Sequence, residues 1–193
     1  MNFEEANKKY KLNQIKGWMD SCDMEWLFEQ SQKMKNSKIV EIGSWQGKST
    51  SAILSAMDKS NTLSCIDTWK GTIGEDGFYD DVQVAFETFK NNIHKFNQDV
   101  NIIIKNSIES LEDIEDNSID WLFLDADHSE EAATIDINNW IKKMKKGSLF
   151  SGHDWQFPSI KSAIKNTIKN IDGYTTHQNK QNETVGSIWW KRI

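Results

Sequence analysis

The sequence has few of the residues that interrupt or cross-link a chain. Its 193 residues include one proline, ten glycines and two cysteines. So little proline and glycine leaves little room for a disordered linker, and we expect a single globular domain. Cys22 and Cys65 lie far apart without a CxxC spacing, and Cys65 falls in an expected buried strand. This pattern favours free thiols in a reducing, cytosolic setting.

The sequence also lacks an excess of positive charge and a long apolar run. The formal net charge is −6, which gives no general attraction to phosphate backbones and disfavours nucleic acid as a partner. Residues 1–5 have neither a basic start nor an apolar core, and no apolar run approaches the about 18 residues of a membrane-spanning helix. We therefore expect a cytoplasmic protein with no membrane partner.

The most informative stretch is a short apolar run that meets two glycines and continues in a helical pattern. The strand pattern over 38–42 is followed by Gly43 and Gly47. Such a loop lets a ligand approach bare backbone N–H groups. About 20 residues past the second glycine, the strand pattern over 62–66 ends in Asp67, the spacing at which a carboxylate meets a ribose. Together these features predict a nucleoside-type cofactor.

Strand and helix patterns alternate along most of the chain. The expected strands are 38–42, 62–66, 100–104, 119–124 and 147–151, and the expected helices are 48–58, 79–95, 107–113, 130–143 and 159–169. This alternation predicts an α/β protein with a Rossmann-like, doubly wound, mostly parallel sheet. The runs 174–177 and 184–190 predict a C-terminal hairpin. Residues 1–36 are polar and helix-prone, and we expect them to form a helical cover ahead of the main domain, 37–193.

Acidic residues and histidines cluster after two of the expected strands. The clusters are DADHSEE at 125–131 and GHDW at 152–155. In a parallel sheet both strand ends open onto the crevice that the glycine loop lines. Asp125 and Asp154 are then placed to share a divalent cation such as Mg²⁺, and His128 is placed to act as a general base.

Plainer structural roles compete at several of these positions. Asp127 and Glu130 fit an N-cap and its partner for the helix from residue 130, and this is the role we favour for them. His153 fits a residue that hydrogen-bonds its neighbours, and Asp154 alternatively fits a cap of the turn that follows it. The tryptophans assigned to packing are Trp18, Trp26, Trp121, Trp140, Trp189 and Trp190.

Four motifs in this order resemble those of the class I S-adenosylmethionine-dependent methyltransferases. The motifs are VEIGSWQGKST, CIDTWKG, LDADHSEE and GHDW. Within that class they resemble the small macrocin O-methyltransferase-like group, which includes metal-dependent sugar methyltransferases. The resemblance implies a seven-stranded sheet whose last strand is antiparallel, which agrees with the hairpin pattern. It also implies S-adenosylmethionine as cofactor and O-methylation of a small hydroxylated acceptor such as a sugar.

The resemblance also carries roles to individual residues. The cofactor-binding residues that it implies are Glu41, Gly43, Ser44, Gly47, Asp67, Thr68, Trp69, Ser107 and Asp125. The first four surround the methionine part, Asp67 takes the ribose hydroxyls and Ser107 lies near the adenine. Asp125 and Asp154 match positions that hold Mg²⁺ in metal-dependent relatives, and His128 matches a proposed base. His153 stands where some metal-binding relatives carry a carboxylate, so the metal requirement stays open, as does the choice between His128 and Asp125 as base.

Other functions start from the same features. The run GSWQGKS nearly matches a phosphate-binding loop, but it is one residue short between the glycines, and Glu41 would repel a triphosphate. A nicotinamide dehydrogenase would need a third glycine and a catalytic Tyr-Lys pair. A non-catalytic cofactor-binding or scaffold protein is a third alternative, because Glu130 stands where relatives carry an aromatic.

Trp45 and Trp69 either pack on the cofactor or belong to the core. We expect loop 70–78 to close over the acceptor.

Overall fold

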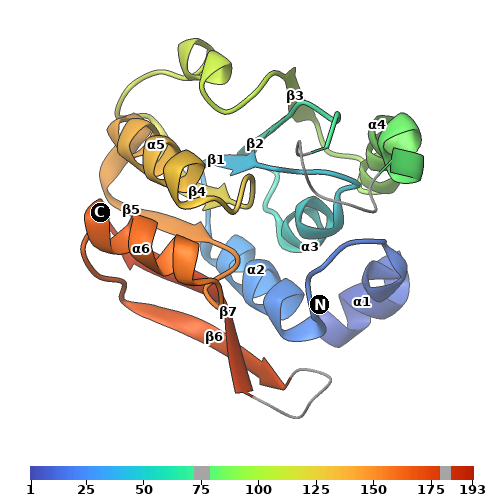
Figure 1. Ribbon diagram of the computed structural model, residues 1–193. Helices are drawn as coiled ribbons and strands as arrows, with labels where there is room; N and C mark the ends of the chain where they lie inside the picture. The colour runs from blue at the N-terminus through green and yellow to red at the C-terminus, as the bar shows by residue number, and fades with distance from the viewer. Residues whose placement is uncertain (72–78, 179–183) are drawn as a thin grey trace.

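The computed structural model describes residues 1–71, 79–178 and 184–193, which form a seven-stranded sheet between two layers of helices (Figure 1). The strands are β1 (Lys38–Ile42), β2 (Thr62–Asp67), β3 (Val100–Ile104), β4 (Ile119–Leu124), β5 (Met144–Gly152), β6 (Gly173–Gln178) and β7 (Thr184–Arg192). Their order across the sheet is β3-β2-β1-β4-β5-β7-β6. The first five are parallel, whereas β7 runs antiparallel to both β5 and β6. The expected mostly parallel sheet with an antiparallel C-terminal hairpin is confirmed.

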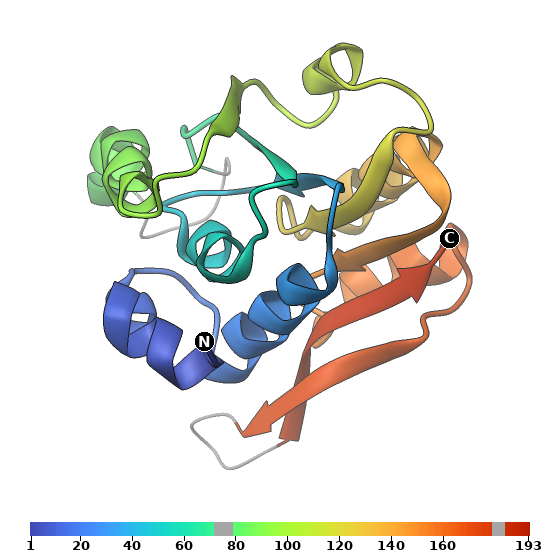
Figure 2. The ribbon, with the colours of Figure 1, turned by 180° about the vertical axis from the view of Figure 1, so that it is seen from behind.

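Helices cover both faces of this sheet. They are α1 (Phe3–Tyr10), α2 (Ser21–Lys33), α3 (Lys48–Ala56), α4 (Tyr79–His94), α5 (Glu130–Trp140) and α6 (Pro158–Asn166), with short 3-10 turns η1 (Leu12–Gln14), η2 (Glu109–Asp113) and η3 (Ile141–Lys143). Figure 2 shows α1, α2 and α3 together on one side of the sheet, whereas α5 and α6 lie on the other. Among the described residues, none of the helices has the length and apolar content needed to cross a lipid bilayer.

The central strands are buried on both faces, which explains their nearly unbroken apolar sequences. Successive side chains of a strand point to opposite faces. In β4, Trp121 and Phe123 pack beneath the layer of α1 to α4, while Leu122 and Leu124 pack beneath α5 and α6. Because both faces are covered, β4 shows no alternation of apolar and polar residues.

The beginning of α5 differs from the sequence-based expectation. Its N-cap is Ser129, whose Oγ accepts a hydrogen bond from the Ala132 backbone N–H at 3.3 Å. Asp127 instead accepts from the Ser129 N–H at 2.7 Å. Glu130 reaches α6, where its Oε1 accepts from Ser162 Oγ at 2.6 Å. The expected capping pair of Asp127 and Glu130 is therefore wrong, because a tight turn places Ser129 between them at the capping position.

Gly43 allows the loops after β1 and β4 to touch. Its φ is +86°, and a Cβ atom at this position would lie 1.8 Å from the backbone oxygen of Asp125. The Gly43 N–H also donates to the Ile66 carbonyl at 2.9 Å. Only glycine combines this dihedral angle with such a close approach of two backbones.

The cost of that close approach can be separated from the cost of the dihedral angle. Gly147 has φ +84°, and a Cβ atom added there would meet no other atom within 4 Å, so Gly147→Ala is a matched control for Gly43→Ala. We expect Gly147→Ala to lower the free energy of unfolding by about 1–2 kcal/mol, the backbone cost alone. Gly43→Ala should cost at least about 2 kcal/mol more, because a backbone carbonyl must move. Urea unfolding of both variants measures the difference, and equal losses would show that no collision occurs.

Candidate active site

A cavity of about 790 Å³ opens at the carboxyl ends of the parallel strands. Residues at or just after the ends of five different strands line it: Gly43, Asp67, Ser107, Asp125 and Asp154. The cavity lies where β1 separates β2 from β4, which is the point where the order of the strands reverses. Its volume is typical of a site for small molecules. The topology thus brings together residues that are more than 100 positions apart in the sequence.

Not all the residues singled out in the sequence reach this cavity. Those that line it are Gly43, Asp67, Thr68, Ser107, Asp125, His128 and Asp154. Those that are absent from its lining are Glu41, Ser44, Gly47 and Trp69. Most of the expected lid, 70–78, lies outside the described residues. Gly71, at its start, is described and lines the cavity.

Glu41 lies behind the glycine loop. Its side chain is fully buried and accepts hydrogen bonds from Ser44 Oγ at 2.7 Å, from Thr50 Oγ1, and from Cys65 Sγ at 3.4 Å. Burial raises the pKa of its carboxyl group, although the surrounding hydroxyl groups oppose that shift. Glu41 shares a strand face with Ile39, beneath α3, because residues two apart in a strand point the same way. The hydrogen bonds that Glu41 accepts from Ser44 and Thr50 stabilise the glycine loop and the start of α3 from the buried side.

Asp67 joins two loops at the edge of the cavity. Its Oδ2 accepts from the Trp45 N–H at 2.7 Å, and its Oδ1 accepts from the Trp69 N–H at 2.6 Å. Burial raises the pKa of the Asp67 carboxyl group, and these backbone donors partly offset the rise. Trp69 packs against Phe86 and Phe89, so it belongs to the core, whereas Trp45 lines the cavity. Each carboxylate oxygen has two lone pairs, so Asp67 retains capacity to accept further hydrogen bonds.

Two histidines and two aspartates meet on the opposite side of the cavity. His128 Nε2 lies 2.9 Å from Asp154 Oδ2. His153 Nδ1 lies 3.2 Å from Asp154 Oδ1 and 3.6 Å from Asp125 Oδ1. The alternative that the Asp154 side chain caps the following turn is wrong, because the Phe157 N–H of that turn donates to the Asp154 backbone carbonyl at 2.9 Å. Asp154 instead holds both imidazole rings.

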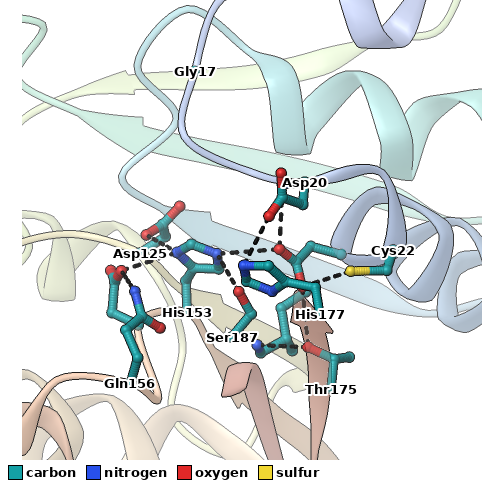
Figure 3. A network of polar contacts seen from close by, with 12 residues as sticks. Gly17, Asp20, Cys22, Asp125, His153, Gln156, Thr175, His177 and Ser187 are labelled. Carbon is teal, nitrogen blue, oxygen red and sulfur yellow. Dashed lines mark hydrogen bonds and ion pairs between the residues drawn. The ribbon is translucent and has the colours of Figure 1, made fainter. Parts of the chain in front are cut away.

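His153 extends this cluster to the N-terminal helix α2 (Figure 3). Its Nε2 lies 3.6 Å from Oδ2 of Asp23, which is completely buried on α2, and 3.5 Å from Ser187 Oγ. Thr175 Oγ1 donates to Asp23 Oδ1 at 3.0 Å. Sequence reasoning missed Asp23, because nothing in its surroundings indicates a partner 130 residues away. It adds a third carboxylate around a single buried imidazole.

The charges of this cluster depend on one another. Burial would lower the pKa of His153, but Asp125, Asp154 and Asp23 raise it well above its usual value. Burial raises the pKa of Asp125 to about 7 despite the neighbouring histidines. Burial would also raise the pKa of Asp154, but the hydrogen bonds from His128 and His153 lower it well below its usual range. His153 is thus a buried cation flanked by carboxylates.

Two further residues of the cavity were not expected there. Trp18 precedes α2, is 64% exposed, and has its ring centroid 6.4 Å from that of Trp45. Its assignment to packing is wrong, because most of its side chain is exposed and it lines the cavity. Asp136 lies on the inner face of α5, is buried, and lines the cavity near Ser107. The sequence could not predict this position, because a single acidic residue within a helix gives no indication that its side chain lines a cavity.

Asp136 predicts a change of stability with pH. Burial raises the pKa of its carboxyl group from 3.8 to about 6. The native protein therefore binds this proton more tightly than the unfolded chain, and its stability falls as the pH rises through that interval. Asp136→Asn removes the titrating group, so we expect the variant to gain about 2 kcal/mol relative to the wild type between pH 4 and pH 7. Urea unfolding across this range tests the expectation, and a difference that does not vary with pH contradicts it.

The chain is similar to known proteins in both sequence and structure. A family model described as "Methyltransferase domain" matches residues 40–155, which run from β1 to just beyond β5. A curated relative, the uncharacterized protein y4gI of Sinorhizobium fredii, is 27% identical over an alignment of 148 residues that covers 70% of this chain. This chain spans only 16% of the length of that relative.

Solved structures share the fold at low sequence identity. An O-methyltransferase from Bacillus cereus in complex with SAH superposes with a TM-score of 0.67 at 14% identity, covering 99% of this chain and 90% of the other. The O-methyltransferase TomG from Streptomyces achromogenes, involved in tomaymycin synthesis and solved with SAM, has a TM-score of 0.64 at 10% identity, covering 99% and 87%. At such identities the likeness shows the fold alone.

Proposed function

The chain belongs to the methyltransferase domain family, and from that premise we propose that it transfers a methyl group from S-adenosylmethionine to a hydroxyl group of a small molecule such as a sugar. The observation that carries the proposal is the convergence of Asp67, Asp125, Asp154 and His128 on one cavity from three different strand ends. A single pocket then offers both a site for a nucleoside and a group that accepts a proton.

The charge of the cavity supports a cationic cofactor. Among the described residues, the acidic groups that line it are Asp67, Asp125, Asp127, Asp136 and Asp154, and the basic groups are Lys105, His128 and His153. This excess of carboxylates favours a ligand that carries an ammonium and a sulfonium group. It disfavours the triphosphate of a nucleotide, which also weakens the alternative of a phosphate-binding loop.

The cofactor contacts follow from the position of each strand end. We assign the ribose hydroxyls to Asp67, whose carboxylate is held by two backbone N–H groups and can accept more bonds. Thr68, Gly43, Asp125 and Ser107 also line the cavity. We assign Ser107 to the adenine and the other three to contacts near the ribose and the methionine part. Glu41, Ser44, Gly47 and Trp69 would act indirectly, by shaping the loops that carry these contacts.

In this proposal His128 removes the proton of the acceptor. When bound, S-adenosylmethionine supplies an electrophilic methyl group whose carbon–sulfur bond breaks as the acceptor oxygen attacks in line. With Nε2 of His128 held by Asp154, the hydroxyl proton would pass to Nδ1. The ionised Asp154 stabilises the resulting imidazolium, as carboxylates do for other catalytic histidines that they orient. Asp125, whose pKa burial raises to about 7, is the other candidate base, but His128 has a carboxylate oxygen of Asp154 at 2.9 Å to stabilise its charged form.

The proposed mechanism uses no metal. Asp125, His128 and Asp154 bring possible ligand atoms within 4.8 Å of one another. However, both oxygens of Asp154 already contact an imidazole, and the cationic His153 faces Asp125 and Asp154. A Mg²⁺ ion would have to displace these contacts and share the space with a buried positive charge. The donor set therefore fits Mg²⁺ poorly, and no step of the proposed mechanism passes through it.

The acceptor would occupy the part of the cavity beside His128. Trp18 and Phe157 are exposed by 64% and 40%, and both line the cavity. Exposed aromatic faces suit the apolar face of a ring, such as a sugar or an aromatic ring. A non-catalytic cofactor-binding protein is the second candidate, but Glu130, the residue that favoured it, contacts Ser162 on α6 rather than lining the cavity.

Ligand titration and a methyl-release assay test the proposed function directly. Calorimetry should detect binding of S-adenosylmethionine and no binding of ATP at the same concentrations. A panel of sugars, catechols and small hydroxylated acids should then contain at least one acceptor that releases S-adenosylhomocysteine. Binding of ATP instead would refute the cofactor assignment, and cofactor binding without turnover on any acceptor would favour the non-catalytic alternative.

His128→Ala separates catalysis from cofactor binding. Loss of a general base typically slows a reaction by about 10²–10⁴-fold, so we expect kcat to fall by at least the lower bound. The dissociation constant of S-adenosylmethionine should stay unchanged, because His128 faces the acceptor. His94→Ala, at an exposed position at the end of α4, is the matched control. Turnover of His128→Ala close to that of the control would remove His128 from the mechanism.

Asp67→Ala should have the opposite effect. It removes the carboxylate assigned to the ribose hydroxyls, and loss of hydrogen bonds to a charged group costs about 1.5–3 kcal/mol, or about 10–100-fold in affinity. Calorimetry with S-adenosylmethionine measures this loss, with Asp99→Ala at an exposed position as control. Cofactor analogues that lack the ribose hydroxyls should lose affinity for the wild type but not for Asp67→Ala. An unchanged dissociation constant would refute the ribose assignment.

A further inference from the structure

We propose a second ligand site, a zinc site formed by Cys22, Asp23 and His177 where the start of α2 meets β6. It is separate from the cavity, since none of these three residues lines it. Figure 3 shows Cys22 and His177 on one side of His153, with Asp125 and Gln156 on the other. The site does not depend on the proposed methyl transfer.

The donor atoms of the three residues are close enough to share one ion. One ligand atom from each, a thiol sulfur, a carboxylate oxygen and a ring nitrogen, lies within 4.8 Å of the other two. Cys22 Sγ is 3.9 Å from Asp23 Oδ1. Ligands of a tetrahedral zinc ion, at about 2.0–2.3 Å from the metal, are separated by similar distances. The residues come from elements more than 150 positions apart, so the fold alone brings them together.

Asp20 prepares His177 to bind a metal. Oδ2 of Asp20 lies 2.8 Å from His177 Nε2, which places the ring proton on that nitrogen. Nδ1 of His177 then presents a lone pair, and this atom is buried with no hydrogen-bond partner among the described residues. A carboxylate that holds the other nitrogen of a ligating histidine is the usual arrangement around zinc. A buried acceptor that lacks a donor is otherwise unfavourable.

The mixture of donor atoms favours zinc over harder cations. Thiolate, imidazole and carboxylate are the three ligand types of protein zinc sites, whereas Mg²⁺ and Ca²⁺ take oxygen ligands. In the metal-free protein, burial together with Asp23 and Asp20 raises the pKa of the Cys22 thiol to about 11, so the thiol is neutral. As the sulfur–zinc bond forms, the thiol releases its proton to solvent. Asp20 and Asp23 also offset the unfavourable field that the N-terminus of α2 exerts on a cation.

A bound ion would link the N-terminal helix to the C-terminal hairpin. Cys22 and Asp23 belong to α2, and His177 belongs to β6. Asp23 also faces His153, which contacts Asp125 and Asp154 in the cavity. Zinc bound at this site would therefore fix the position of a carboxylate that borders the active-site cluster.

Cobalt and zinc titrations of the reduced full-length chain test the site. Co²⁺ bound through a thiolate gives a sulfur-to-metal charge-transfer band in the near ultraviolet, which oxygen and nitrogen ligands do not. We expect this band in the wild type, saturating at one ion per chain and disappearing when Zn²⁺ displaces Co²⁺. Cys22→Ser should abolish the band, while Cys65→Ser, which changes the other cysteine, should retain it.

Calorimetry with Zn²⁺ provides the second measurement. Asp20→Asn should weaken binding by about 10–100-fold, the loss typical of a group that orients a ligating histidine. His177→Gln should weaken it further, whereas His94→Gln should leave it unchanged. Circular dichroism of each metal-free variant verifies folding. Absence of the charge-transfer band in the wild type, or equal zinc affinity in the wild type, Cys22→Ser and His177→Gln, would overturn the proposal.

Discussion

The buried imidazole of His153 is the interaction on which the rest of the site depends. Its two nitrogens face carboxylates from three parts of the chain, Asp23 on α2, Asp125 after β4 and Asp154 after β5. A buried cation is tolerated only when opposite charges surround it, and buried carboxylates likewise need a cation or donors. The three segments are therefore held together by the attraction between these carboxylates and the His153 ring. Asp154 in turn positions His128.

This arrangement constrains the side of the cavity that lies at the ends of β4 and β5. The side of β4 and β5 is crossed by charged contacts and by the touching backbones of Gly43 and Asp125. The lining also includes two exposed rings, Trp18 and Phe157, which contact Trp45 and His128 respectively. Fixed positions at these strand ends suit the proposed reaction, because reacting groups must be held in a defined geometry.

Local patterns were sufficient to predict the sheet and the strand ends that meet at the cavity. The alternation of strands and helices predicted the topology, and Asp67, Asp125, His128 and Asp154 lie where the parallel sheet required. Asp23, Trp18 and Asp136 were missed because their positions depend on how separate elements pack, which no periodicity records. Glu41 faces α3 through strand alternation, so only its neighbours reach the cavity. The division between a helical cover, 1–36, and a main domain, 37–193, stays a prediction.

The position of β7 in the sheet has a consequence for folding. β7 lies between β5 and β6, and its Ser187 contacts His153, whose other partner Asp23 is on α2. The helix α2 must therefore wait for β7, which comes more than 150 residues later in the sequence, before its buried aspartate is enclosed. Pairing across so much of the chain gives a high contact order, and such pairings form late in folding. The charged cluster around His153 is thus completed late in folding.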